Sequence, residues 1–261
     1  MSERNMNRIE NFGDERQAGF CPQCGQAPET RDHVPPKFFL DDPYPEEFPP
    51  VLACEKCNNG ASLDEQFVAC LIDCAIVGDA VPGPRHREKV NRTLVARPSL
   101  AAKVAIQGRR NLDGRTLIQI EGTRVDRVLL KMARGHALFE LNDPHPYDPT
   151  SLWFRPLNEM TSATRANFIS APHQGQWPEV GSRAMQRLAE RFPGGPEWVV
   201  VQEGRYRYLA LAHPTPAVRI VLSEYLAVEA RWHDRDGQAS LIGGECEERS
   251  LAQRSAKFTP F

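Results

Sequence analysis

The chain has 261 residues, of which 41% are hydrophobic and 25% are charged, as is typical of a folded globular protein. Its most apolar run, residues 67–78, is shorter than the roughly 20 residues that a membrane-spanning helix needs, so we expect no membrane span. The first residues are polar and of mixed charge, unlike a secretory signal. We therefore expect a cytoplasmic protein, in which structural disulfides are unusual.

The formal net charge of −2 hides a strong asymmetry along the chain. Residues 1–80 hold six Lys or Arg against fifteen Asp or Glu, net −9, whereas residues 81–135 hold thirteen against four, net +9. A basic segment of this kind is typical of polyanion-binding surfaces, but also of ordinary solvated surfaces. Two interpretations of residues 85–134 therefore stay open: a nucleic-acid track that includes Arg124, Arg127 and Lys131, or plain surface.

The first part of the chain is expected to be a small unit braced by a metal. Residues 1–18 lack apolar periodicity and are predicted to be a flexible tail. Residues 20–59 are rich in Cys, Pro, Asp and Gly, with only short apolar pieces. Ser62 and Glu65 fit a capping box before an apolar run, which predicts a helix over residues 63–77. Glycines and prolines from Gly78 onward indicate a linker.

The second part of the chain is predicted to mix helices with an antiparallel sheet. The pattern predicts a strand at 116–122, a basic amphipathic helix at 124–139 and a helix at 180–192. Glu203-Gly204 is a hairpin signal between strands at 198–202 and 205–211, and residues 219–232 alternate as a strand does. The expected organisation is a zinc unit at 19–80, a basic linker at 81–97, an α+β accessory domain at 98–245 and a polar tail at 246–261.

Four of the seven cysteines form two CxxC pairs, which is the strongest signal in the sequence. Cys21 pairs with Cys24 and Cys54 with Cys57. Four thiolates in a cytoplasmic chain are typical ligands of a tetrahedral structural Zn²⁺. Cys70 and Cys74, four residues apart on the predicted helix, are interpreted as buried packing residues.

Between and just after the CxxC pairs lie residues suited to hydrolytic chemistry. Asp32 and an Asn of the Asn58-Asn59 pair offer oxygen ligands to a hard cation such as Mg²⁺ or Mn²⁺. His33 titrates near neutral pH and is able to take a proton from water. Adjacent residues of a strand point to opposite faces, so Asp32 and His33 are expected to have different roles. Taken singly, these residues fit a turn, a surface histidine and a helix cap equally well.

The order CxxC, Asp32-His33 before a proline-containing stretch (DHVPPKFF), then CEKCNNGASLDEQF and later VLLKMARGHALFEL, resembles the HNH endonucleases. The resemblance covers residues 20–78 well and 124–141 loosely. It implies an α+β fold in which an N-terminal ββα-metal finger, braced by a four-cysteine zinc, precedes a C-terminal α+β domain with an antiparallel sheet. It makes His33 the general base, Asp32 and Asn58 ligands of a catalytic Mg²⁺ or Mn²⁺, and Cys21, Cys24, Cys54 and Cys57 ligands of the structural zinc.

Two positions depart from the family pattern. Pro50 stands where many members have an Asn that orients the base, and Ala61 stands where many have a Lys. A backbone carbonyl or Asn59 is expected to orient His33 instead. Arg31 and Lys37 are expected to supply phosphate contacts, and Asn59 is a further candidate for substrate binding. The function implied is a divalent-metal-dependent endonuclease acting on DNA, in phage biology or phage defence, as a homodimer or with a defence-system partner. The alternative is a catalytically silent zinc module that binds nucleic acid or protein.

Overall fold

The computed structural model describes residues 19–46, 50–110, 116–118, 122–171, 177–190 and 195–232. The tails predicted at 1–18 and 246–261 lie outside these residues. Within the described ranges, no helix combines the length and apolar character needed to cross a bilayer. The fold mixes helices and strands, as the sequence predicts, and includes one five-stranded antiparallel sheet among the described residues.

The N-terminal part has the order strand, strand, helix. Strand β1 (Thr30–His33) pairs antiparallel with β2 (Pro50–Ala53), and the short 3-10 helix η2 (Lys37–Phe39) lies between them in sequence. Helix α1 (Glu55–Val77) follows directly and ends at Gly78, whose φ of 86° is the left-handed cap conformation that glycine adopts without strain.

Helix α1 begins eight residues before the predicted start. Cys54 is its N-cap, and the Cys54 Sγ accepts the backbone N–H of Cys57 at 3.4 Å. Ser62, predicted to be the cap, lies inside the helix, where its hydroxyl donates to the Asn59 carbonyl. The capping-box prediction is therefore wrong, because the second CxxC pair already satisfies the start of the helix.

The C-terminal part begins with helices. Helix α4 (Gly122–His136) continues into the π-helical turn η3 (Ala137–Leu141). It is preceded by helix α2 (Glu88–Ala96), helix α3 (Pro98–Gln107) and the paired strands β3 (Gly108–Arg110) and β4 (Thr116–Ile118). Beyond these lie η4 (Leu157–Glu159), α5 (Ser162–Ile169) and α6 (Arg183–Glu190).

The large sheet has the strand order β5-β9-β8-β7-β6 and is antiparallel throughout. Its strands are β5 (Ser151–Pro156), β6 (Val199–Gln202), β7 (Tyr206–Leu211), β8 (Ala217–Leu222) and β9 (Leu226–Arg231). The hairpin at Glu203-Gly204 is confirmed. The segment predicted as one strand at 219–232 contains two, joined by Ser223 and Glu224, which both have positive φ. These residue types rarely adopt that conformation, so the turn gave no sequence signal.

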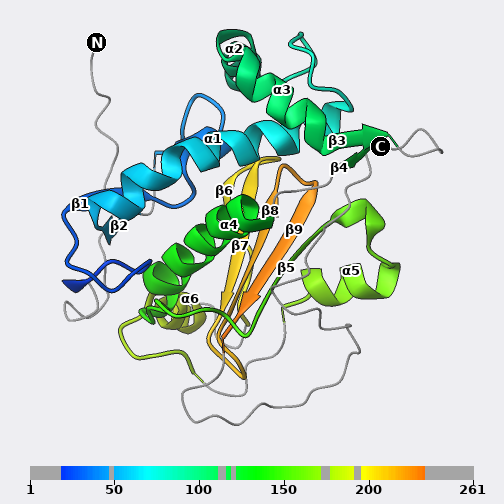
Figure 1. Cartoon of the computed structure of the whole chain (residues 1–261). Helices are drawn as coiled ribbons and strands as arrows, with labels where there is room; N and C mark the ends of the chain where they lie inside the picture. Colours follow the sequence, from blue (N-terminus) through cyan, green and yellow to red (C-terminus); the bar gives the residue numbers. More distant parts are fainter. Residues whose placement is uncertain are drawn as a thin grey trace.

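Helices cover both faces of this sheet. On one face, α4 runs across the strands and α1 lies beyond it (Figure 1). The apolar side chains of this layer, from Phe67 and Leu71 of α1 through Val128 and Met132 of α4 to Ile220 of β8, form one continuous core. On the other face, Phe168 of α5 packs with Val221 and Ala227.

Segment 81–97, predicted as a basic linker, contains α2 and is bound to the N-terminal part. The Arg87 guanidinium donates to Asp41 Oδ1 and to the Leu40 carbonyl, each at 2.8 Å. The Lys89 ammonium donates to the same carbonyl at 2.9 Å. Two of the basic residues that raise the charge of this segment therefore hold residues 37–41 in place.

Candidate functional site

The four predicted zinc ligands lie together. Their sulfur atoms are all within 4.8 Å of one another, and none forms a disulfide. Cys21 and Cys24 lie in a tight turn, closed by the Gly25 N–H donating to the Cys21 carbonyl at 2.8 Å, and Cys54 and Cys57 lie at the start of α1. This cluster can hold a metal ion such as zinc. Among the described residues, no other group of three or more His, Cys, Asp or Glu side chains is placed to hold a metal ion.

The donor set of the cluster fits Zn²⁺. Four convergent thiols leave no position for a water or a substrate, as in structural sites. The backbone N–H of Cys57 lowers the pKa of the Cys54 thiol, whereas burial raises the pKa of the Cys21 and Cys57 thiols. Cys70 and Cys74, by contrast, are buried in the apolar core around α1, in agreement with a packing role.

Asp32 and His33 lie side by side on β1 but differ in environment. Asp32 is buried and is paired across the ladder with buried Val51, whereas His33 is half-buried opposite Pro50. Alternation along the strand sends the two side chains to different faces, as expected. Burial is the main cause that lowers the pKa of His33, and the positive charge of Lys37 adds to it, while Asp32 acts in the opposite direction.

Asn58 joins the first turn of α1 to β1. Its amide Nδ2 donates to Thr30 Oγ1 at 3.1 Å and to the Arg31 carbonyl at 3.2 Å, beside the peptide that leads into Asp32. Its Oδ1 is therefore the atom left for a cation. Asn59, in contrast, is exposed and donates to Glu55 Oε1 at 3.3 Å, so its amide group is directed along the helix.

A buried lysine that the sequence interpretation placed on the surface contacts Asp32. Lys131 Nζ of α4 lies 2.8 Å from Asp32 Oδ2 and donates to Glu65 Oε1 of α1 at 2.5 Å. Burial lowers the pKa of Lys131, but the two carboxylates outweigh it and the net shift is upward. Burial also raises the pKa of Glu65, against the effect of Lys131. Glu65, an acid just before the apolar run of α1, was the available signal for this contact.

The other two residues of the predicted nucleic-acid track also face an acid. Arg124 Nε lies 2.7 Å from Asp64 Oδ1, and Arg127 Nη1 lies 2.6 Å from Asp64 Oδ2. Lys131 is buried and is therefore not part of a solvent-facing track. Arg124 and Arg127 pair with Asp64 of α1, but the Arg127 side chain is still 61% exposed.

Basic side chains do surround His33 on the outer face of the small sheet. Arg31 is exposed and shares a face of β1 with His33, and Lys37 is close enough to influence its pKa. Lys37 also lies over the Tyr44 ring, 5.8 Å from its centroid. Ala61, at the family's lysine position, is buried in α1, so a lysine there would not reach solvent freely.

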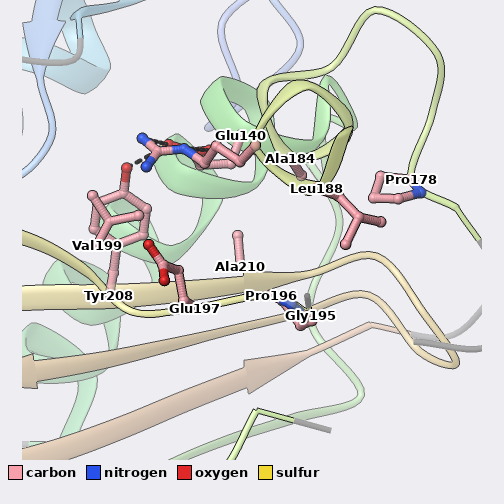
Figure 2. A pocket seen from close by; sticks show the side chains of 11 residues that line it. Glu140, Pro178, Ala184, Leu188, Gly195, Pro196, Glu197, Val199, Tyr208 and Ala210 are labelled. Carbon is pink, nitrogen blue, oxygen red and sulfur yellow. Dashed lines mark hydrogen bonds and ion pairs between the residues drawn. The ribbon is translucent and has the colours of Figure 1, made fainter. Parts of the chain in front are cut away.

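A separate small pocket lies between α6 and the sheet (Figure 2). Glu140 of η3 forms its polar end, where the Tyr208 hydroxyl donates to Glu140 Oε1 at 2.5 Å and Arg187 approaches from α6. The pocket has a free volume of about 30 Å³, which is room for roughly two water molecules. Its lining does not include Asp32, His33 or Asn58.

Comparisons of the chain with protein-family models, curated proteins and solved structures find no match. The function is therefore argued from the geometry of the residues themselves.

Proposed function

We propose that the N-terminal unit hydrolyses phosphodiester bonds of DNA with the help of a divalent cation. One observation carries this proposal: Asp32 and His33 lie on a strand to which Asn58 is hydrogen-bonded, at the end of α1 that also carries two cysteines of the zinc cluster. A carboxylate, an imidazole and an amide are thus held on a small scaffold that the metal cluster braces.

His33 is the candidate general base. Because burial lowers its pKa, its imidazole is neutral at pH 7 and able to accept a proton from a water molecule. The oxygen donors of Asp32 and Asn58 suit Mg²⁺ or Mn²⁺, and such an ion supplies charge neutralisation at the scissile phosphate when bound. In the described conformation, Lys131 already contacts one oxygen of Asp32.

The substrate contacts are assigned to Arg31 and Lys37. Both are basic residues near His33, and Arg31 is exposed. Contacts to phosphate supply affinity without sequence preference and weaken as salt rises. Replacing Arg31 with Ala is therefore expected to weaken DNA binding for all sequences alike and to lower its dependence on salt. Asn59 remains a candidate for substrate contact, since its side chain is exposed and its amide donates to Glu55, which is exposed as well.

A plasmid-nicking assay tests the nuclease proposal. We expect the zinc-loaded protein to convert supercoiled plasmid to open circles with Mg²⁺ or Mn²⁺, and the His33→Ala variant to be at least about 100-fold slower, as is typical when a general base is removed. The matched control is His213→Ala, which changes a histidine far along the chain, in the turn between β7 and β8. Equal cleavage by wild type and His33→Ala would contradict the assignment of the base.

The second candidate, a zinc module that binds nucleic acid without cleaving it, is favoured by the Asp32–Lys131 ion pair and by Pro50 opposite His33. This candidate predicts that the protein slows the migration of DNA in a gel whether or not divalent ions are present. It also predicts that the plasmid stays supercoiled with every divalent metal ion tested. Binding that requires Mg²⁺ or Mn²⁺ would argue against it.

A further inference from the structure

Three chain segments meet at one buried ion cluster. Asp32 comes from β1, Glu65 from α1 and Lys131 from α4, and their exposed fractions are 6%, 9% and 4%. The Lys131 ammonium lies between the two carboxylates, 2.8 Å from Asp32 and 2.5 Å from Glu65. We call these three residues the lysine cluster.

With both of its carboxylates ionised, the lysine cluster is short of positive charge. Two carboxylates share a single ammonium, and the neighbouring cations do not make up the difference, because Arg124 and Arg127 are both paired with Asp64. Buried carboxylates are stable as anions only when a cation is close. A small cation with two charges would balance Asp32 and Glu65 better than one ammonium does.

An ammonium bound to a buried carboxylate weakens the binding of a divalent ion to the same carboxylate, because like charges a few ångströms apart repel where water is scarce. We infer that Lys131 is a tethered cation that competes with a divalent metal ion for Asp32, so that the ion binds there only when the ammonium withdraws. This inference rests on the proposed function in taking Asp32 as a metal ligand.

The competition connects the metal site to the C-terminal sheet. Lys131 lies on α4, which packs against β8 and β9, so the sheet holds the ammonium in its position. Anything that shifts α4 away from β1 would free Asp32 for the metal ion, and metal binding would favour that shift to the same degree.

Calorimetric titration of the zinc-loaded full chain with Mn²⁺, without DNA, tests the inference. We expect the Lys131→Met variant, which keeps the length of the side chain and removes its charge, to bind Mn²⁺ at least tenfold more tightly than wild type. The matched control is Arg127→Met, which removes a positive charge one turn away on α4 that pairs with Asp64; its Mn²⁺ affinity should stay near that of wild type.

Equal or weaker Mn²⁺ binding by Lys131→Met would overturn the inference and make Lys131 a residue that merely fixes Asp32. Adding Asp32→Asn to Lys131→Met should abolish the gain; a gain that persists would place the ion elsewhere and would also overturn it. If Lys131→Met is unfolded without metal, Mn²⁺ should refold it, as followed by circular dichroism, and failure to refold would count against competition. Because no step depends on cleavage, tighter Mn²⁺ binding without nicking would reject the nuclease while retaining the competition.

Discussion

His136, at the last position of α4, is fully buried against the sheet. Its ring stacks on Tyr208 with centroids 3.7 Å apart, and its Nε2 lies 2.8 Å from the Tyr206 hydroxyl. Burial lowers the pKa of His136 to about 3, so the folded protein holds the neutral imidazole throughout the neutral and mildly acidic range.

This burial predicts a loss of stability in mild acid. In the unfolded chain the pKa of a histidine is about 6.5, so between pH 6.5 and 3 the unfolded state binds a proton that the folded state does not. The free energy of unfolding should fall as pH falls through that window, by up to about 1.4 kcal/mol per pH unit from this residue. His136→Phe, which keeps an aromatic ring, should show a shallower fall in urea titrations at pH 7, 6 and 5.

The comparison of these two proteins isolates His136 because all other groups, including the four clustered thiols, are the same in both. Parallel stability curves for wild type and His136→Phe would contradict the lowered pKa of His136, because they would mean that this residue takes up a proton as readily in the folded state as in the unfolded state.

For single residues, the sequence predicted contacts where a recognisable motif such as CxxC marks the residues. It did not predict contacts between unmarked residues of distant segments. The CxxC pairs were identified because four thiols near one another have few roles other than metal binding. Lys131 was placed on the surface because a charged side chain in an amphipathic helix is usually solvated. Only the tertiary contact of α4 with α1 and β1 brings Asp32 and Glu65 to it.

At the scale of elements, Cys54 has two roles that a substitution can separate. It is both a member of the thiol cluster and the N-cap of α1. Serine is a good N-cap residue but a poor zinc ligand, so Cys54→Ser should preserve the cap and lose the metal. We expect zinc content to fall from one ion per chain toward zero, and the free energy of unfolding to fall by at least roughly 3 kcal/mol.

Metal analysis by emission spectrometry and urea unfolding measure the two quantities. Cys70→Ala is the control, since Cys70 is buried in the core around α1 and lies outside the thiol cluster. A zinc content of one ion per chain in Cys54→Ser would contradict the four-thiol site.

The contact of α4 with the segment after β1 depends on the absence of a side chain at Gly135. A Cβ at this position would lie 2.5 Å from Val34 Cγ2, far inside normal contact distance. Gly135→Ala should therefore lower the free energy of unfolding by about 1–3 kcal/mol, as overpacking of a buried contact typically does. Thermal or urea unfolding measures the change.

Gly60→Ala is the matched control, because Gly60 lies in α1 and a Cβ there meets nothing within 4 Å. This control should be stabilised by roughly 0.5–1 kcal/mol, the usual gain of alanine over glycine in a helix. Removing the Val34 methyl groups together with Gly135→Ala should cost less than the sum of the two single changes. Additive losses would mean that the two residues do not touch.

Helix and strand positions were predicted best where periodicity was strong. The helix at α4, the strands β6 and β7 and the hairpin between them were expected from apolar spacing and a glycine turn. Strand β5 was missed although it is as long as β7, because it ends in a proline, which is rare within strands. The start of α1 was missed because a sulfur atom acts as its cap. Neither segment carries a local sequence signal for the register in which β5 pairs with β9.

At the scale of the whole molecule, one core crosses the boundary that composition suggested near residues 81–97. Leu40 and Phe67 of the N-terminal part belong to the same apolar cluster as Tyr208 and Val228 of the large sheet. Glycines and prolines after Gly78 indicated a linker, but α1 packs against α2, α3 and α4, and α4 packs against the sheet. We therefore expect the two parts to unfold together.

Two spectroscopic probes test this expectation. The four tryptophans all lie at or beyond Trp153, in the C-terminal part, whereas α1, the longest helix among the described residues, lies in the N-terminal part and contributes to far-ultraviolet circular dichroism. In urea, tryptophan fluorescence and circular dichroism at 222 nm should therefore give one coincident transition. Circular dichroism and fluorescence midpoints that differ by more than about 0.5 M, at the usual slopes for such proteins, would indicate two independent units.

The strand order carries a consequence for synthesis of the protein. Strand β9, at residues 226–231, lies between β5, at 151–156, and β8. As the chain leaves the ribosome, β5 emerges about seventy residues before its partner, with one strand edge and its apolar side chains unmatched. The sheet can close only after β9 has emerged, so the interval before that point is when the nascent chain is most exposed to mispairing with other strands.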